Sequence, residues 1–163
     1  QKRRTPTEYG AQLKQQQALR AIYNIRERQL ERYFREARAE RGVTADALVS
    51  RLESRLDRIV YRLGFGQSQG HARQLVHHGL ITVNGRRVDL PSYAVAVGAV
   101  VQIKEAKREK PALTTLKERV ATKTLPPWLT REDPWTGKVV AVPQPDPAEL
   151  PVDLRAVVEF YSR

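Results

Sequence analysis

Residues 51–64 read RLESRLDRIVYRLG, a segment with the periodicity of an amphipathic helix. At about 100° per residue, four arginines share one narrow sector, and aliphatic side chains cover the adjoining sector. No acidic residue lies among these arginines, whereas an ordinary solvated helix surface mixes opposite charges at i,i+4 spacing. Arginine suits bidentate phosphate contact, so the stripe favours a polyanion-binding surface over a merely solvated one. The stripe consists of Arg51, Arg55, Arg58 and Arg62.

A second, shorter helix is predicted between Ser68 and Gly79. The Ser68 hydroxyl can accept from the exposed first-turn amides, and Gly79 can take the left-handed conformation that ends a helix. Gln69, Arg73 and His77, at positions i, i+4 and i+8, share one face of this helix, opposite a compact apolar arc. This polar line is a second candidate contact surface.

The pattern then changes to an alternation around Asn84-Gly85, the strongest short hairpin signal, because both turn residues need positive φ. Pairing Val83 with Arg86 turns Arg87 outward, beside the polar line of the preceding helix. The β-rich run at residues 95–103 is expected to return as a further strand. Two helices packed on a small, twisted antiparallel sheet therefore form the predicted α/β module, at residues 51–110.

The residues before the module predict a small helical domain. One helix is expected from Glu8 to about Tyr23, a second from residue 26 to residue 41, and a third from Thr44. Glutamates beside the arginines of the second helix leave polyanion contact and an ion-paired surface as open alternatives. Those arginines are Arg28, Arg32 and Arg35.

The residues after the module are rich in proline, with seven of the ten prolines between Pro126 and Pro151. A short helix at residues 113–120 and a short strand at residues 137–142 are expected, within an otherwise extended segment that wraps on a surface. Trp128 and Trp135 are predicted as apolar anchors, and base stacking by Trp128 is the alternative. Residues 7–50 with 111–163 are thus predicted as one helical domain of an α+β protein, and residues 1–6 as a basic arm.

Composition independently indicates a polyanion partner. The chain has 163 residues, a net charge of +11 and a pI of about 10.3, yet residues 111–163 carry no net charge. There is no cysteine, which excludes disulfides and cysteine-ligated metal in this sequence. No apolar run approaches the roughly 18 residues of a membrane span, so we expect a cytoplasmic protein. Because the sequence opens on Gln1 within a basic run, we also expect further residues to precede it.

Residues 55–95, RLDRIVYRLGFGQSQGHARQLVHHGLITVNGRRVDLPSYAV, closely resemble the RNA-binding module named after the fourth protein of the small ribosomal subunit. The flanks resemble the bacterial form of that ribosomal protein family: TEYGAQLKQQQALRAIYNIRERQLERYFREA at residues 7–37, PPWL at 126–129 and VEFYSR at 158–163. One departure is Leu80, where the family often has histidine. Some members carry a zinc-binding cysteine cluster near the N-terminus, and some repress their own messenger.

The resemblance implies a structural constituent of the small subunit that binds the 5′ domain of 16S ribosomal RNA at a helix junction. It further implies a role early in assembly, a place near the messenger entry channel and a contribution to decoding accuracy. Contact with small-subunit protein five is expected through the first helix and the C-terminal end. The residues implied in that contact are Tyr9, Gln12, Val158, Phe160 and Tyr161.

Two other functions are weighed against this one. An RNA-modifying enzyme of the pseudouridine synthase type can use the same module, but Asp57 lies within the module, where a local ion pair is the simpler interpretation. The neutral, proline-rich tail also leaves no room for a catalytic domain. A DNA-binding regulator would need a recognition helix. No cofactor, metal, membrane or small-molecule substrate is expected, since the adjacent His77 and His78 point about 100° apart on a helix.

The predicted RNA contacts therefore run from the N-terminal arm to the end of the module. They are Lys2, Arg3, Arg4, Arg20, Arg28, Arg32, Arg35, Arg51, Arg55, Arg58, Arg62, Ser68, Gln69, Arg73, Gln74, His77, Asn84, Arg86, Arg87, Lys104 and Lys107.

Overall fold

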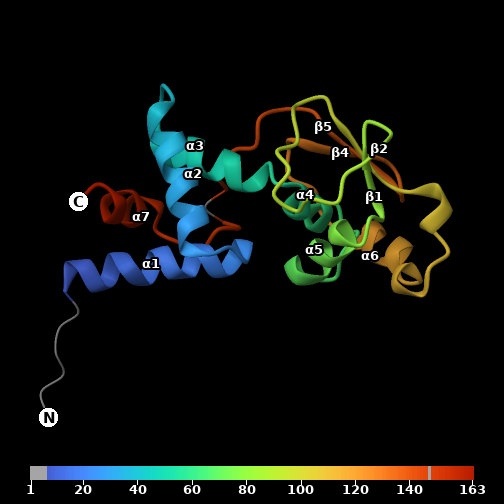
Figure 1. The fold of residues 1–163 in the computed structure, drawn as a ribbon, viewed down its shortest axis with the longest axis horizontal. Coiled ribbons are helices and arrows are strands. Elements are labelled where there is room, and N and C mark those ends of the chain that lie inside the picture. Colours follow the sequence, from blue (N-terminus) through green and yellow to red (C-terminus); the bar gives the residue numbers. More distant parts are fainter. Residues whose placement is uncertain (1–6, 147) are drawn as a thin grey trace, which may run out of the picture. The chain divides into compact units, whose positions relative to one another are not determined.

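The computed structural model describes residues 7–146 and 148–163, which form two compact units (Figure 1). The first unit combines the residues up to Ser50 with those from Gln144 onward, and the second comprises Arg51–Pro143. The predicted contacts at Lys2, Arg3 and Arg4 lie outside the described residues.

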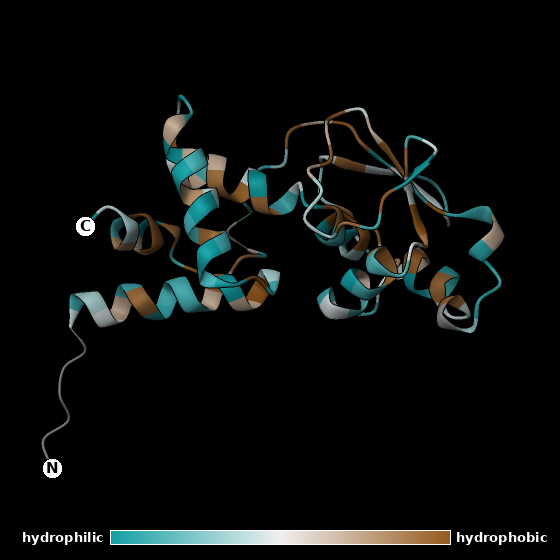
Figure 2. Cartoon of the chain, in the orientation of Figure 1, coloured by the Kyte–Doolittle hydropathy of each residue, from teal (hydrophilic) through white to brown (hydrophobic). Residues whose placement is uncertain are grey.

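The first unit is helical. Thr7 caps its first helix by accepting from the Gly10 amide at 3.1 Å, and Asn24 ends that helix in the left-handed conformation with φ of 53°. The helices combine apolar and polar residues (Figure 2), and the C-terminal helix packs against the first. The elements of this unit are α1 (Glu8–Tyr23), α2 (Glu27–Ala39), α7 (Leu154–Tyr161) and α3 (Thr44–Glu53), which leads into the second unit.

The second unit is a five-stranded antiparallel sheet with three α-helices and two short 3-10 turns, at Glu105–Lys107 and Pro111–Leu113. The strand order is β2-β1-β3-β5-β4. The predicted α+β class is therefore confirmed. The elements are α4 (Leu56–Arg62), α5 (Gln69–His77), α6 (Leu116–Thr122), β1 (Ile81–Val83), β2 (Arg86–Arg87), β3 (Val100–Ile103), β4 (Leu129–Asp133) and β5 (Thr136–Val139).

The β1–β2 hairpin has the predicted register, with Val83 opposite Arg86. Asn84 and Gly85 both have positive φ, 51° and 81°, as a tight hairpin turn of the primed type requires. The Asn84 side chain also accepts from the Val100 amide at 2.9 Å. The turn is therefore fixed to β3 as well as to its own strands.

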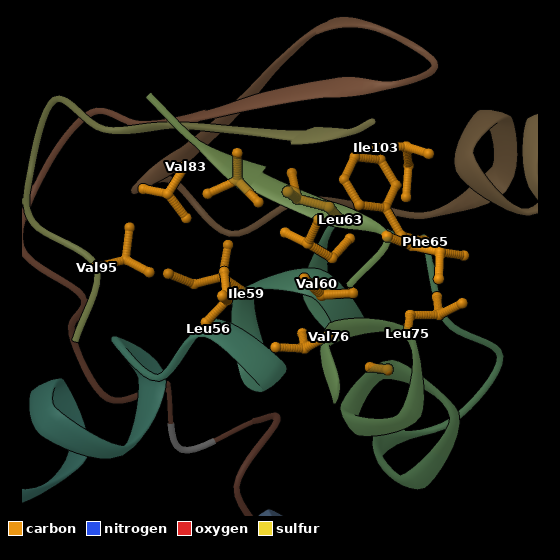
Figure 3. Packing of buried hydrophobic residues seen from close by; sticks show 14 of the residues in the cluster. Leu56, Ile59, Val60, Leu63, Phe65, Leu75, Val76, Val83, Val95 and Ile103 are labelled. Carbon is orange, nitrogen blue, oxygen red and sulfur yellow. The ribbon is translucent and has the colours of Figure 1, made fainter. Parts of the chain in front are cut away.

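The core of the second unit lies between the sheet and its helices. Figure 3 shows Ile59 of α4, Leu63 directly after α4 and Val76 of α5 on the helix side of the core, facing Val83 and Ile103 of the sheet. All five are at least 95% buried. Burying side chains of this size stabilises the fold by about 1.5–3 kcal/mol each.

The predicted continuous helix at residues 51–64 is wrong, because the chain leaves the helical conformation between α3 and α4. Arg55 is extended, with φ of −62° and ψ of 140°, and forms a bridge with Ala94. The Val95 amide donates to the Ser54 carbonyl at 2.9 Å, and the Leu56 amide donates to the Tyr93 carbonyl at 2.9 Å. Backbone hydrogen bonds from residues 93–95 thus replace those of the helix.

The sequence predicted that residues 111–143 belong to the helical unit, but in the structure they lie with the module. The reason is that β5 pairs with β3 and thereby extends the module's sheet. Trp128 is 4% exposed and belongs to the same core, so the packing interpretation of this tryptophan is confirmed over base stacking. Strand β4 had not been predicted, and β5 spans residues 136–139 instead of 137–142.

Candidate nucleic-acid interface

The arginine stripe is not formed as predicted, and one of its members is fully internal. Arg55 is 2% exposed and donates two parallel hydrogen bonds to Asp57, from Nε to Oδ1 and from Nη2 to Oδ2, both at 3.0 Å. The local ion pair predicted for Asp57 is confirmed. The Arg55 guanidinium is therefore occupied within the fold rather than presented to a phosphate.

Two further arginines of the stripe converge on one buried carboxylate. Glu53, 2% exposed, accepts from Arg58 Nε at 2.9 Å and from Arg62 Nε at 2.7 Å. Arg58 also donates to the Gln69 side chain at 3.1 Å, which ties α4 to α5. The break after Glu53 brings this carboxylate to the arginines, so the expectation of a stripe without acidic partners is corrected. Arg51 lies in the last turn of α3 and is partly exposed.

Helix α5 presents polar side chains on its outer face. Arg73, Gln74 and His77 are exposed, whereas Gln69 is partly buried. Ser68 caps the helix as predicted, by accepting from the His71 amide at 3.1 Å. The outer face of α5 thus offers one cation, one amide and one imidazole.

The imidazole of His71 supports the segment that leads into α5. Burial, together with the nearby charge of Arg119, lowers the pKa of His71 below its usual value. The neutral ring accepts from the Gln67 amide through Nδ1 at 2.9 Å. His71 therefore has a structural role in the loop before the helix.

The β1–β2 hairpin brings more positive charge to the end of α5. Arg86 and Arg87 are exposed, and so is Asn84. The Arg87 guanidinium lies over Gly79, at the end of α5, where any side chain would collide with it. The exposed Lys104 lies close to Gly79 as well, because its backbone amide donates to the carbonyl of the next residue, Leu80, at 2.8 Å. We call the group Arg73, Gln74, His77, Arg86, Arg87 and Lys104 the α5–hairpin surface.

The predicted contacts of the helical unit lie mostly on α2. Arg28, Arg32 and Arg35 are exposed and line one open groove, whereas Arg20 of α1 is only partly exposed. Arg35 lies 2.9 Å from Glu31, and Arg32 lies 4.0 Å from Glu36. Exposed pairs of this kind contribute at most about 1 kcal/mol, so they leave the arginines open to a phosphate.

The residues expected to contact a partner protein also take part in the packing of α7 within the helical unit. The rings of Tyr9 and Phe160 lie 5.7 Å apart, while Tyr161 stacks on Phe34 at 4.9 Å. Gln12 donates to Glu159 at 3.2 Å and accepts from Arg163 at 2.6 Å. Val158 is partly buried on the same helix. These residues close α7 on α1, and Tyr9, 48% exposed, is the most open of the aromatic rings.

Two arginines attach α6 and the β4–β5 hairpin to the segment that follows α4. Neither was identified from the sequence. Arg119 donates to the Phe65 carbonyl at 2.8 Å, and Arg131 donates to the Leu63 carbonyl at 3.4 Å. Burial lowers the pKa of both guanidinium groups. Their partners are backbone carbonyls more than fifty positions away in the chain, so no local pattern marks them.

Over residues 7–146 and 148–163, no group of three or more histidine, aspartate or glutamate side chains is placed to hold a metal ion. Within the same ranges, none of the helices combines the length and the apolar composition needed to cross a lipid bilayer.

Two helices on a small sheet, with a cationic hairpin beside the second helix, define a protein built around an S4 domain, and the family comparison agrees. Residues 54–101 match the S4 domain, and residues 1–53 match the N-terminal domain of ribosomal proteins S4 and S9. The small ribosomal subunit protein uS4 of Pelotomaculum thermopropionicum is 46% identical over 164 residues, covering 100% of this chain and 79% of that protein. The uS4A protein of Symbiobacterium thermophilum is 46% identical over 99% of this chain and 78% of its own length.

The chain belongs to the family of small ribosomal subunit protein uS4. It is therefore a structural protein of the ribosome and not an enzyme.

Proposed function

We propose that the chain binds the 5′ domain of 16S ribosomal RNA at a helix junction and nucleates assembly of the small subunit. The observation that carries the proposal is the α5–hairpin surface, in which Arg73, Arg86 and Arg87 are exposed on one S4 domain and Lys104 is exposed just after it. Guanidinium and ammonium groups contact phosphates, which position the protein without reading sequence.

The uncharged members of the surface supply selectivity for RNA over DNA. Gln74 and His77 are exposed beside the cations, and Ser68 and Asn84 lie at the ends of the elements that carry them. Amide, imidazole and hydroxyl groups can pair with 2′-hydroxyls and base edges in the shallow groove of an RNA helix. The exposed arginines of α2 provide a second set of phosphate contacts from the helical unit.

The proposal includes a protein partner. Contact with small-subunit protein five is made through the exposed face of α1 around Tyr9. Helix α7 packs against α1 and stabilises it there. A contribution to translational accuracy follows from that contact. The protein acts in the cytoplasm as part of the small ribosomal subunit.

A salt-dependent titration tests the RNA proposal. The purified chain is titrated against the 5′ domain of 16S RNA and against an unrelated RNA of equal length, by filter binding at several salt concentrations. We expect selective binding with a steep salt dependence, which decreases by roughly 0.7–0.9 in log–log slope for each lost phosphate contact.

Variants assign the contacts. Arg73→Gln and Arg87→Gln should each weaken binding and reduce the salt slope, because each removes one exposed cation of the α5–hairpin surface. Arg155→Gln is the matched control, since Arg155 is an exposed arginine of α7, with a side-chain accessibility of 89%. Equal binding to both RNAs, or equal losses for all three variants, would contradict the proposal.

A further inference from the structure

A second cationic site lies at the end of the sheet where β1 begins and β3 ends. Ile103 is the last residue of β3 and pairs with Ile81, the first residue of β1. At the same end, the Ile103 amide donates to the Trp135 carbonyl at 3.0 Å, so the β4–β5 turn lies beside the exit of β3. The residues that follow β3 and the first turns of α6 complete an open pocket of about 420 Å³ around Trp135.

Positive charge dominates the lining of this pocket. Arg108, Lys110 and Lys117 line it, and Glu109 is the acidic residue among them. In the part of the chain that the structure describes, none of the three cations forms an ion pair with a carboxylate. They differ in this from Arg55 and Arg58, whose charges are matched inside the fold.

The indole of Trp135 holds two of these cations. The Arg108 guanidinium carbon lies 5.4 Å from the ring centroid, and the Lys117 ammonium lies 5.8 Å from it. Both distances fall within the range of cation–π attraction, about 6 Å. Arg108 is held a second time, because its Nε donates to the Ile103 carbonyl at 3.4 Å.

Holding the cations against Trp135 reduces the entropy that is lost when the pocket binds an anion. Long basic side chains lose rotamer freedom when they grip a ligand, and a cation already held against an aromatic ring has less freedom left to lose. The Trp135 backbone is fixed as well, since its amide donates to Asp133 Oδ1 at 2.7 Å. A group carrying delocalised negative charge, with several acceptor oxygens, is the ligand that this donor set fits.

We infer that the pocket formed by Arg108, Lys110, Lys117 and Trp135 binds a phosphate group of RNA, with Trp135 as the positioning residue. The inference rests on the proposed function for the identity of the polyanion. It adds a contact that is separate from the α5–hairpin surface and is built from residues 108–135, which follow the S4 domain match in the chain.

The first test removes one charge at the pocket. Lys117→Gln in the full chain should weaken binding to the 5′ domain RNA about 3-fold to 10-fold and lower the salt slope by roughly 0.7–0.9. Lys14→Gln, an exposed lysine of α1, is the matched control. Both substitutions lie on exposed helix surfaces, so the fold is retained, which circular dichroism verifies. Identical affinities and slopes for the two variants would overturn the inference.

The second test uses Trp135 as its own reporter. Subtracting the fluorescence of Trp135→Phe from that of the unaltered chain isolates the Trp135 signal from the buried Trp128. We expect this signal to change on addition of the 5′ domain RNA, and the change to be smaller in Lys117→Gln. An unchanged signal with every RNA would overturn the inference.

Two further measurements distinguish a failure of the phosphate pocket from a failure of the proposed function. Inorganic phosphate at a matched phosphate concentration should produce a weaker response than RNA, and a response to inorganic phosphate alone would mean a free-anion site and would overturn the RNA assignment. Loss of preference for the 5′ domain over the unrelated RNA contradicts the proposed function. A Trp135 response to both RNAs would still support the phosphate pocket in that case.

Discussion

Arg55 and Asp57 are both almost inaccessible to solvent, and their side chains form a buried ion pair. A buried ion pair of this kind adds little net stability over an apolar pair, because removing both charges from water is costly. Removing only one partner is strongly destabilising, since it leaves an uncompensated charge in the interior. Arg55 and Asp57 therefore enforce one conformation at the junction of α3 and α4.

Asp57→Asn should reduce the free energy of unfolding by about 3–5 kcal/mol, because the Arg55 guanidinium stays buried without its counter-charge. Urea denaturation followed by circular dichroism measures the change. Glu36→Gln, which alters a solvent-exposed pair, should shift the same quantity by less than about 1 kcal/mol. Similar losses for the two variants would show that the buried pair has no special role.

Gly79→Ala should impair RNA binding as well as stability. Gly79 has φ of 78°, so alanine there is strained by about 1–2 kcal/mol, and its Cβ also displaces the Arg87 guanidinium. Gly98→Ala is the matched variant, because Gly98 has φ of 93° and open space around it. Affinity for the 5′ domain RNA, measured where both variants are folded, should fall only for Gly79→Ala. Equal affinities would mean that the position of Arg87 is unimportant.

Side chains with local roles were predictable from the sequence, whereas side chains with distant partners were not. The Ser68 cap and the Asn84–Gly85 turn follow from positions one to three residues apart. The burial of Arg58 depends on the break before α4, and hydrogen bonds from residues 93–95 stabilise that break. Helical periodicity within residues 51–64 contains no information about those bonds.

Helix α7 has eight residues, too few to be stable alone, and it depends on its contacts with α1. Gln16 is fully buried in α1 and donates to the Tyr161 hydroxyl of α7 at 2.9 Å. Burial raises the pKa of Tyr161 above its ordinary value, with Glu27 and Glu31 adding to the shift and the Gln16 hydrogen bond opposing it. The contact between α1 and α7 therefore favours a protonated Tyr161.

The stability of the helical unit should decline above about pH 10. Below that pH the phenol of Tyr161 is protonated in both the folded and the unfolded chain, so it adds no pH dependence. At higher pH the unfolded chain loses this proton first, and the free energy of unfolding falls. Tyr161→Phe should remove that part of the decline, which urea titrations between about pH 8 and 11 would detect. An unchanged pH profile in the variant would contradict this assignment.

Tyr161→Phe should also cost about 1–3 kcal/mol at neutral pH, because the buried Gln16 amide loses its acceptor. Tyr9→Phe is the control, since the Tyr9 ring is about half exposed. Equal stability of the two variants in urea denaturation at pH 7 would sink the prediction.

Elements with a long apolar period were predictable, and β5 was predicted with shifted bounds, whereas β4 was not predicted. The helices α1 and α2 lie within one to two residues of their predicted bounds. Strand β4 reads LTRED and has no alternation of apolar and polar residues that would mark it, and its partner β5 spans four residues. Only the pairing of β5 with β3 reveals that this hairpin belongs to the sheet.

The boundary between the two units has a measurable consequence. The apolar cluster of the second unit runs from Leu56 to Val139, so residues 111–143 supply part of the core and one of the two neighbours of β3. A fragment of residues 51–143 should therefore unfold cooperatively in urea. A fragment of residues 51–110, the extent predicted from sequence, lacks Trp128 and β5 and should be much less stable. Equal midpoints for the two fragments would restore the shorter boundary.

The first unit is assembled from both ends of the chain, whereas the second is continuous in sequence. During synthesis, residues 51–143 emerge before α7, so the sheet and its arginine-bearing hairpin can be complete while α1 still lacks its packing partner. A nascent chain thus acquires its folded S4 domain first and its closed helical unit last. The order of synthesis makes the emergence of α7 the moment at which the surface around Tyr9 takes its final form.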